Sequence, residues 1–192
     1  MNTFPNIRNQ AGVSMIEVLV TLIILLVGLL GMAGLQAQSQ RSEMESYQRV
    51  QALILLQDMA GRINANRQVA SSYAVTSSSG TPYFGTSATA TAACSAGTTE
   101  QQTRAVEDMQ EWSSLIAGSA ETSGGTNIGA MVGARGCVNY DATTQSYLVT
   151  VVWQGLGKTA APPSGLNCAT GLYGDETQRR AVSLTVRIAT LS

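Results

Sequence analysis

The chain has 192 residues and a formal net charge of −1, and only 12% of its residues are charged. Its 11 lysines and arginines are spread along the sequence, so no basic cluster supports direct nucleic-acid binding. The chain has no histidine, which excludes Ser-His-Asp and Cys-His catalysis and histidine-based zinc sites. We therefore assign no catalytic, cofactor-binding or metal-binding residue.

A long uncharged segment stands near the N-terminus. Residues 18–35 carry no charge and are rich in Leu, Ile and Val. As a helix they span about 27 Å, close to the roughly 30 Å hydrocarbon core of a bilayer. In residues 1–12 the one charged side chain is Arg8, which favours a cytoplasmic start and an exported C-terminal part. This order predicts a single-pass membrane helix.

Two other interpretations of this segment stay open. A secretory signal peptide would end at a small-x-small site, such as residues 31–33, but its apolar region is normally about 7–15 residues long. A permanent single-span anchor would hold an exported binding protein or enzyme. Neither accounts for the Gly12-Val13 junction, or for Glu17 at the point where the apolar run begins.

This junction carries a family resemblance. Residues 12–19, Gly-Val-Ser-Met-Ile-Glu-Val-Leu, resemble the class III signal of type IV pilins and type II secretion pseudopilins. The resemblance implies that a prepilin peptidase cuts between Gly12 and Val13 and that Val13 is then N-methylated. Val13 departs from the phenylalanine usual in the family. Glu17 takes the family's acidic position near the mature N-terminus.

Glu17 allows two interpretations. In a filament of packed helices its carboxylate would be buried and would need a partner. The family's proposed partner is the methylated terminal amine of a neighbouring subunit, and this pair would set axial register because an unpaired buried charge is costly. The alternative is a solvated acid at a helix start, where the helix dipole favours it.

The helical pattern continues beyond the membrane segment to about residue 67. Asp58 and Arg62 stand four residues apart and support a helix through an ion pair on its surface. Apolar residues at helical spacing predict a face that packs against a soluble domain. These residues are Met44, Tyr47, Leu53, Leu56, Ala60 and Ile63.

The remaining chain predicts a small head. Residues 70–99 are rich in Ser, Thr, Ala and Gly and indicate loops, with a short strand near Tyr83. Residues 100–117 predict an amphipathic helix in which Trp112 anchors the core or an interface. Period-two alternation predicts strands near residues 136–140, 147–154 and 181–190, which would form a three-stranded antiparallel sheet over the long helix.

The predicted fold class is α+β and pilin-like, in agreement with the resemblance. A long N-terminal helix, membrane-spanning in its first half, packs on a small C-terminal antiparallel sheet. The expected divisions are a leader at residues 1–12, the apolar half of the helix at 13–35, its second half at 36–67, and the globular head at 68–192.

Three cysteines, Cys94, Cys137 and Cys168, lie far apart and form no CxxC motif. In an exported domain they favour one disulfide and a spare thiol. Cys137–Cys168 is the preferred pair because it ties the start of the terminal sheet to the loop crossing it. Pairing through Cys94 stays open, as do three separate thiols in a reducing compartment.

The loop at residues 155–180 contains two adjacent acids, Asp175 and Glu176. Some pseudopilins bind calcium, so the resemblance raises a calcium site here. Two adjacent acids without a further ligand pattern are more typical of a solvated turn.

Further stretches of the sequence narrow the resemblance to one type of pilin. Residues 55–67, and residues 147–155 with 179–182, resemble PilV-type minor pilins. This resemblance implies a subunit held in the inner membrane with its C-terminal domain in the periplasm, and later part of a pilus fibre, with its tip as the expected place. Its partners would be other minor pilins, the major pilin, prepilin peptidase, the pilus assembly machinery and, before assembly, membrane lipid.

Such a subunit would prime pilus assembly and support twitching motility, adhesion or DNA uptake. A type II secretion minor pseudopilin of the GspI type is the alternative within the same superfamily. A membrane-anchored periplasmic binding protein or enzyme is the alternative from another class.

Overall fold

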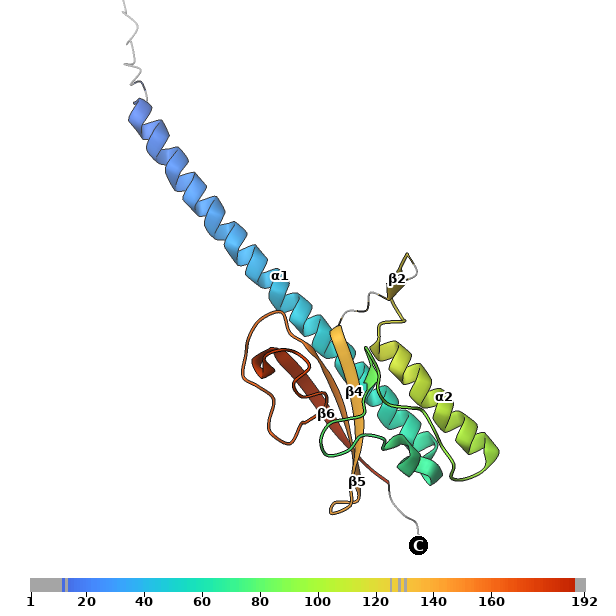
Figure 1. Ribbon diagram of the computed structural model, residues 1–192. Helices are drawn as coiled ribbons and strands as arrows, with labels where there is room; N and C mark the ends of the chain where they lie inside the picture. Colours follow the sequence, from blue (N-terminus) through green and yellow to red (C-terminus); the bar gives the residue numbers. More distant parts are fainter. Residues whose placement is uncertain (1–11, 13, 125, 128, 130, 189–192) are drawn as a thin grey trace, which may run out of the picture. The chain divides into compact units, whose positions relative to one another are not determined.

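The computed structural model describes residues 12, 14–124, 126, 127, 129 and 131–188 (Figure 1). The chain divides into two compact units, Met1–Glu43 and Met44–Ser192. Helix α1, Met15–Ala65, contributes to both. The second unit is the head, and it also contains α2, a four-stranded sheet and a two-stranded ribbon.

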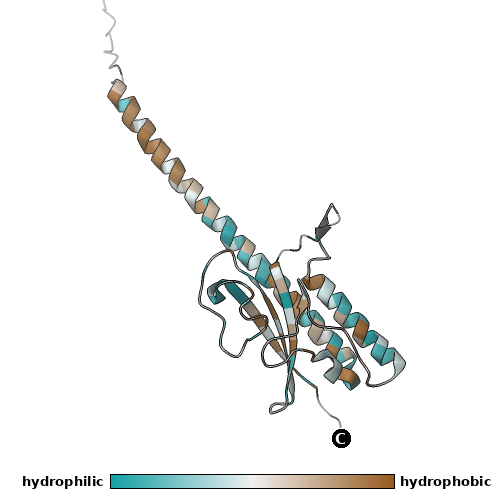
Figure 2. Ribbon diagram, in the orientation of Figure 1, coloured by the Kyte–Doolittle hydropathy of each residue, from teal (hydrophilic) through white to brown (hydrophobic). Residues whose placement is uncertain are grey.

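Helix α1 changes character along its length. Figure 2 shows apolar residues dominating its first half and a mixture of polar and apolar residues in its second half. Leucine, a good helix former, is the most frequent residue of the first half, and Glu17 lies in the first turn, where the helix dipole favours an acid. Burial begins only at Gln48 and recurs at helical spacing, so that one face of the second half packs into the head. The buried residues are Gln48, Ala52, Leu55, Leu56, Met59, Ala60 and Ile63.

This burial corrects the packing face predicted from the sequence. Leu56, Ala60 and Ile63 are buried as expected, whereas Met44, Tyr47 and Leu53 are exposed. The predicted set spanned more than one side of the helix. Apolar spacing alone does not say which side of a helix meets its domain, because both sides here carry apolar residues.

The head sheet has strand order β1-β4-β5-β6, and every neighbouring pair is antiparallel. Strand β5, Ser146–Gln154, is central and buried along nearly its whole length. Its Val149, Val151 and Trp153 join the core that contains α1, while Val152 lies in a smaller cluster around the disulfide. Alternate residues of one strand therefore serve two apolar clusters.

The three other strands are β1, Phe84–Gly85, β4, Val132–Asp141, and β6, Arg179–Arg187. The turn between β4 and β5 is held by Asp141, which accepts hydrogen bonds from Thr143 N and Thr144 Oγ1, both at 2.8 Å. Such local acceptance by an aspartate is a common way to fix a turn.

Helix α2, Thr99–Ile116, begins with a capping box formed by Thr98 and Gln101. It runs alongside the last part of α1 (Figure 1). Trp112 is fully buried, and its indole Nε1 donates to the Leu55 carbonyl oxygen at 2.9 Å. The indole also requires a glycine opposite it, because a Cβ on Gly136 of β4 would lie 2.4 Å from the Trp112 ring. Trp112 is thus a core anchor.

The α+β, pilin-like fold class predicted from the sequence is confirmed. The short strand expected near Tyr83 is present as β1, but the predicted three-stranded sheet was incomplete, because β1 joins it as a fourth strand by pairing with β4. A strand of two residues is too short to show alternation. The sequence also gave no sign of the 3₁₀ helix η1, Arg67–Tyr73, or of the ribbon formed by β2, Thr122–Ser123, and β3, Thr126–Asn127.

Candidate functional site

The N-terminal segment is the first candidate site. Gly12, the residue expected before the cleavage point, is exposed. Val13, the predicted methylation site, and the leader residues 1–11 lie outside the described residues, as do positions 189 and 190 of the predicted last strand.

Glu17 lies in the first turn of α1. The Ser14 carbonyl oxygen accepts the backbone N–H of Glu17 at 2.9 Å and that of Val18 at 3.3 Å, and these bonds start the helix. The Glu17 side chain is exposed and has no hydrogen-bond or ion-pair partner among the described residues. Within the described part of the chain, its carboxylate therefore remains available to a further group.

The apolar run after Glu17 is exposed on every side of the helix. From Val18 to Leu35 each large apolar side chain is about half exposed or more, from 47% at Val20 to 74% at Leu35. Among the described residues, α1 is the helix long and apolar enough to cross a membrane. Such a surface is stable only in lipid or against other apolar helices.

Three glycines interrupt this run, at Gly28, Gly31 and Gly34. A Cβ built on any of them would meet no atom of the chain within 4 Å. The fold of the single subunit therefore does not require glycine there. Glycines at such positions can instead allow another helix to approach closely.

The head carries a second distinctive feature, the disulfide between Cys137 and Cys168. Both cysteines are buried, and the bond joins β4 to the loop between β5 and β6. Cys94 is a free, half-buried thiol that donates to Ser72 Oγ at 3.1 Å. The structure thus brings together the pair preferred from the sequence and leaves Cys94 apart.

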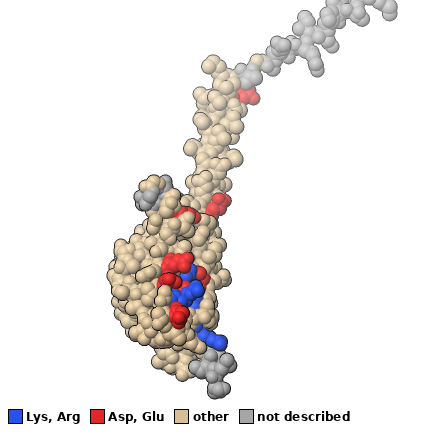
Figure 3. Space-filling model, turned by 90° about the vertical axis from the view of Figure 1, so that its right-hand side faces the viewer, with Lys and Arg blue, Asp and Glu red and all other residues tan. Residues whose placement is uncertain are grey.

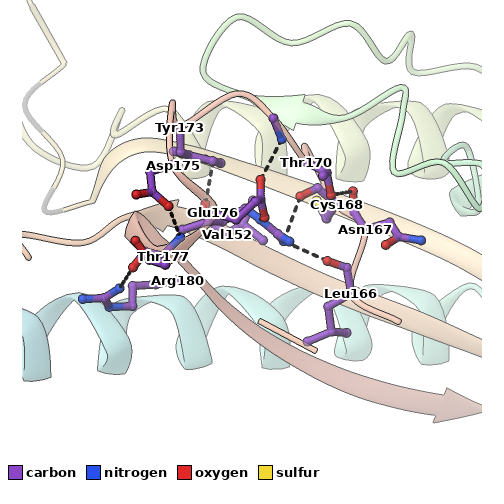
Figure 4. A network of polar contacts seen from close by, with 12 residues as sticks. Val152, Leu166, Asn167, Cys168, Thr170, Tyr173, Asp175, Glu176, Thr177 and Arg180 are labelled. Carbon is purple, nitrogen blue, oxygen red and sulfur yellow. Dashed lines mark hydrogen bonds and ion pairs between the residues drawn. The ribbon is translucent and has the colours of Figure 1, made fainter. Parts of the chain in front are cut away.

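A network of polar contacts, part of which Figure 4 shows around Glu176 and Leu166, fixes the same loop from the other end. Arg179 is 4% exposed, and its guanidinium donates to Glu176 Oε2 at 2.6 Å and to the Leu166 carbonyl oxygen at 2.8 Å. Glu176 also accepts the Gly171 N–H at 2.8 Å. Burial opposes its charge, but these donors lower the pKa of Glu176. The loop is therefore held by a satisfied ion pair as well as by the disulfide.

The acids considered for calcium are occupied by cations of the chain. Asp175 pairs with Lys158 at 2.8 Å and accepts the Thr177 N–H at 2.9 Å, which together lower the pKa of Asp175 to about 2. Glu176 pairs with Arg179. No group of three potential metal ligands occurs among the described residues. The geometry therefore favours loop-fixing ion pairs at these acids over a calcium site.

A polar network joins α1 to α2, on the face where Figure 3 shows acidic and basic side chains gathered. Arg62 donates to Asp58 at 2.8 Å, to Asp108 at 3.0 Å and to Glu111 at 2.9 Å. Burial opposes its charge, but these carboxylates raise the pKa of Arg62. Tyr73 donates to Asp108 at 2.6 Å, and burial together with this bond raises the pKa of Tyr73.

The sequence indicated only the Asp58–Arg62 part of this network. Asp108 and Tyr73 are distant in sequence and showed no pattern that would pair them. Two further contacts bind the sheet to α1: Arg180 donates to Glu45 at 3.0 Å, and the Trp153 indole donates to Gln48 at 3.1 Å. All these contacts lie within the head, where they hold its elements together.

An exposed apolar helix that continues into a head with its own core defines a pilin-like subunit. Two family models support this class: the prokaryotic N-terminal methylation motif matches residues 7–33, and the model of type IV pilin Tt1218 matches residues 34–105. No curated protein and no solved structure matches the chain. Together these matches, which span residues 7–105, support membership of the chain in the type IV pilins.

This membership has direct consequences. A type IV pilin is a structural subunit and not an enzyme. The prepilin leader implies processing by a peptidase and assembly into a pilus with other pilins. The apolar N-terminal helix fits membrane anchoring before assembly.

Proposed function

We propose that this chain is a minor pilin of the PilV type, which primes pilus assembly together with other minor pilins. The single observation that carries the proposal is an apolar helix exposed on every side, which begins at a carboxylate that has no partner in the described part of the chain. The resemblance of residues 55–67 and 147–155 to PilV-type pilins supports the subtype. The subunit would support twitching motility, adhesion or DNA uptake, and its expected place in the fibre is the tip.

Processing is proposed as the first step. The peptidase cuts after Gly12, removing residues 1–12, and Val13 becomes the methylated N-terminus. Residues 13–35 then hold the subunit in the inner membrane, with residues 68–192 in the periplasm as its head and 36–67 as the second half of the helix. The match of the methylation motif to residues 7–33 spans this junction and supports the step.

Glu17 is proposed to set register during assembly. When the helix leaves lipid for a bundle of helices, an unpaired carboxylate becomes costly to bury. The methylated amine of a neighbouring subunit would neutralise it. The exposed side chain of Glu17, which has no partner among the described residues, supports this role.

The test is to replace Glu17 by Ala in the native host. We expect Glu17→Ala to accumulate in the membrane with its leader removed, but to be incorporated poorly into filaments, because no carboxylate is left to pair. Glu43→Ala is the matched control, since Glu43 is an exposed acid of α1 beyond the apolar run. Normal piliation by Glu17→Ala would refute the register role.

Two measurements separate the rival assignments. Mass spectrometry of the mature chain should find methylated Val13, and a chain that starts near residue 36 would indicate a cleaved signal peptide. Deletion of the gene should reduce pili and leave protein secretion intact. Loss of secretion with normal pili would assign the chain to a type II secretion system instead.

A further inference from the structure

The head sheet has two edges that differ in how they are protected, and the edge at β1 is closed. Strand β1 is only two residues long. Next to it, Thr86 N donates to the Ala134 carbonyl oxygen of β4 at 2.9 Å. Further along, Thr76 N donates to the Val138 carbonyl oxygen of β4 at 3.1 Å. A short edge strand and a covered neighbour are common ways in which proteins prevent a further strand from pairing.

The edge at β6 is open by comparison. Strand β6 runs for nine residues and pairs with β5 in one continuous register, without a bulge. It contains no proline, and residues 181–186 carry no charge. Prolines, bulges and charges are the features by which an edge strand normally resists pairing. The middle of β6 has none of them.

Alternate backbone groups of β6 point away from the sheet. The Gln178 carbonyl oxygen accepts the Gly155 N–H at 2.8 Å, which places the hydrogen-bonded pairs of the β5–β6 ladder at even-numbered residues of β6. The odd-numbered residues therefore direct their N–H and C=O groups outward. Beyond the first residue of the strand, these groups have no hydrogen-bond partner among the described residues, at Ala181, Ser183, Thr185 and Arg187. Such a row can pair with another strand.

The side chains of β6 indicate what kind of strand would fit. Leu184 lies on the same sheet face as the buried Val149 and Val186, yet Leu184 is 38% exposed. Ser183 and Thr185 are exposed on the opposite face. In an added ladder Leu184 would take a non-hydrogen-bonded position, where facing side chains approach most closely. A strand that alternates apolar and polar residues would therefore cover Leu184 and leave the hydroxyl face polar.

Charge further defines the added strand. The arginines at the start of β6 are already paired, Arg179 with Glu176 and Arg180 with Glu45. Arg187, at the end of β6, is exposed and has no ion pair in the part of the chain that the structure describes. An acid directly across from Arg187 would form a favourable cross-strand pair.

The same charges disfavour a second copy of this chain as the occupant. If two β6 strands paired antiparallel over their full length, Arg187 would lie across from Arg179 of the second copy. Arg187 would then face another arginine in place of an acid, and like charges directly opposite are unfavourable in a sheet. The edge therefore fits a strand of different sequence better than it fits itself.

We propose that the outer edge of β6 binds an extended segment of another protein, which adds a fifth strand antiparallel to β6. The segment alternates apolar and polar residues and carries an acid across from Arg187. This edge is two strands away from β4, which holds Cys137 of the disulfide. The proposal goes beyond the part proposed for the chain in pilus assembly. Its failure would leave that part untouched, because that part is scored by piliation.

The experiment uses the full chain in detergent micelles and the acetylated, amidated peptide Glu-Val-Thr-Val-Thr-Val-Thr, whose glutamate would lie across from Arg187. Fluorescence anisotropy of the labelled peptide should show saturable binding with a Kd below about 1 mM. Hydrogen exchange should become slower at the amides of Ser183 and Thr185 when the peptide is added. Absence of binding up to this concentration, or binding without such protection, would overturn the proposal.

A matched peptide tests the backbone contribution. The same sequence with N-methyl groups on the threonines across from Ser183 and Thr185 keeps every side chain but lacks the two N–H donors. We expect it to bind at least about tenfold more weakly. Equal binding by the two peptides would show that the contact is not strand addition and would refute the assignment.

Two variants of Thr185 locate the binding on the chain. Thr185→Pro removes an outward N–H that β5 does not use, at an edge position where proline is compatible with the sheet. Thr185→Val is the matched control, because it keeps the N–H and nearly the same shape. We expect Thr185→Pro to weaken binding at least about tenfold and Thr185→Val to leave it nearly unchanged. Circular dichroism checks folding, and unchanged binding by a folded Thr185→Pro would contradict the proposal.

A charge exchange tests the register without changing the backbone. Arg187→Glu should weaken binding of the glutamate peptide about threefold and should strengthen binding of the same peptide with lysine in place of glutamate. Arg187 is exposed, so this variant should fold even if Thr185→Pro does not. An unchanged preference for the glutamate peptide would refute the antiparallel register.

Self-association is the other outcome to be tested. Light scattering of the micelles should give the same oligomeric state for Thr185→Pro and Thr185→Val. A dimer that forms with Thr185→Val and not with Thr185→Pro would show that β6 pairs with a second copy of the chain. That result would overturn the assignment of the edge to another protein.

Discussion

The two units use apolar residues in opposite ways. In residues 18–35 no side chain is buried, whereas the residues of α1 from Gln48 to Ile63 contribute seven buried side chains to the head. The two halves of one helix are therefore suited to two different surroundings. The first unit needs lipid or sister helices around it, while the head carries its own core, ion pairs and disulfide. Stability of the head and competence for assembly should therefore be separable by mutation.

The largest expected difference between a variant in the head and a variant in the exposed apolar run concerns Trp112. Trp112→Ala should lower the free energy of unfolding of the head by about 3–5 kcal/mol, because it opens a cavity and leaves the Leu55 carbonyl oxygen without its donor. Leu25→Ala, in the exposed apolar run, should leave the head unchanged. Urea unfolding in micelles measures both, followed by tryptophan fluorescence, to which Trp153 still contributes in Trp112→Ala. Equal losses would mean that the two units do not unfold independently.

Loss of the disulfide should have the second-largest effect on the stability of the head. Replacing Cys137 and Cys168 together by Ala should cost about 2–4 kcal/mol, because the closed loop no longer restricts the unfolded chain. Cys94→Ala is the matched control, since this thiol is free. The same unfolding assay, with peptide maps before and after reduction, checks the result. A larger effect of Cys94→Ala would contradict the pairing.

A smaller loss is expected at Asp108. Asp108→Asn keeps the side-chain size but removes the charge that Arg62 and Tyr73 share, and should cost about 1–3 kcal/mol. Glu107→Gln, one residue away and exposed, should be near neutral. Thermal unfolding by circular dichroism compares the two. Matching melting temperatures would show that the network contributes little.

The smallest effect is a pH dependence at Asp175. Its pKa is lowered from 3.8 to about 2, so its contribution is present above pH 3.8 and is lost as the pH falls towards 2. Asp175→Asn should therefore lower the melting temperature of the head slightly at pH 6, with the difference from wild type shrinking near pH 2. Because the group is exposed, the shift should also shrink at high salt. A difference that grows in acid would refute the ion pair.

Much of the fold was predictable because it rests on local patterns. The long helix, the helix around Trp112 and the alternation in β5 all follow from apolar spacing, which depends only on nearby residues. The short strand β1 was expected near Tyr83, but its pairing with β4 was not, and the ribbon of β2 and β3 was missed because two-residue strands have no period. The packing face of α1 was half wrong because a helix with apolar residues on both sides does not show which one meets the sheet.

The candidate sites also divide into features that a local sequence motif predicts and features that depend on distant segments. The cleavage junction Gly12-Val13 and the role of Glu17 were predicted from a linear motif, and both stay predictions, since the role of Glu17 depends on a second subunit. The bonds of Arg62 to Asp108 and of Arg179 to Leu166 were not predictable, since the partners come from separate elements.

By itself the sequence determined that a charge-free helix begins at one carboxylate and that a small α+β head follows, because hydrophobic periodicity and residue chemistry are written along the chain. Only the tertiary structure decided which face of α1 meets the sheet, that Cys137 lies against Cys168, and where Asp108 finds its partners. Those outcomes depend on contacts between distant segments, which form only when one core packs all of them at once.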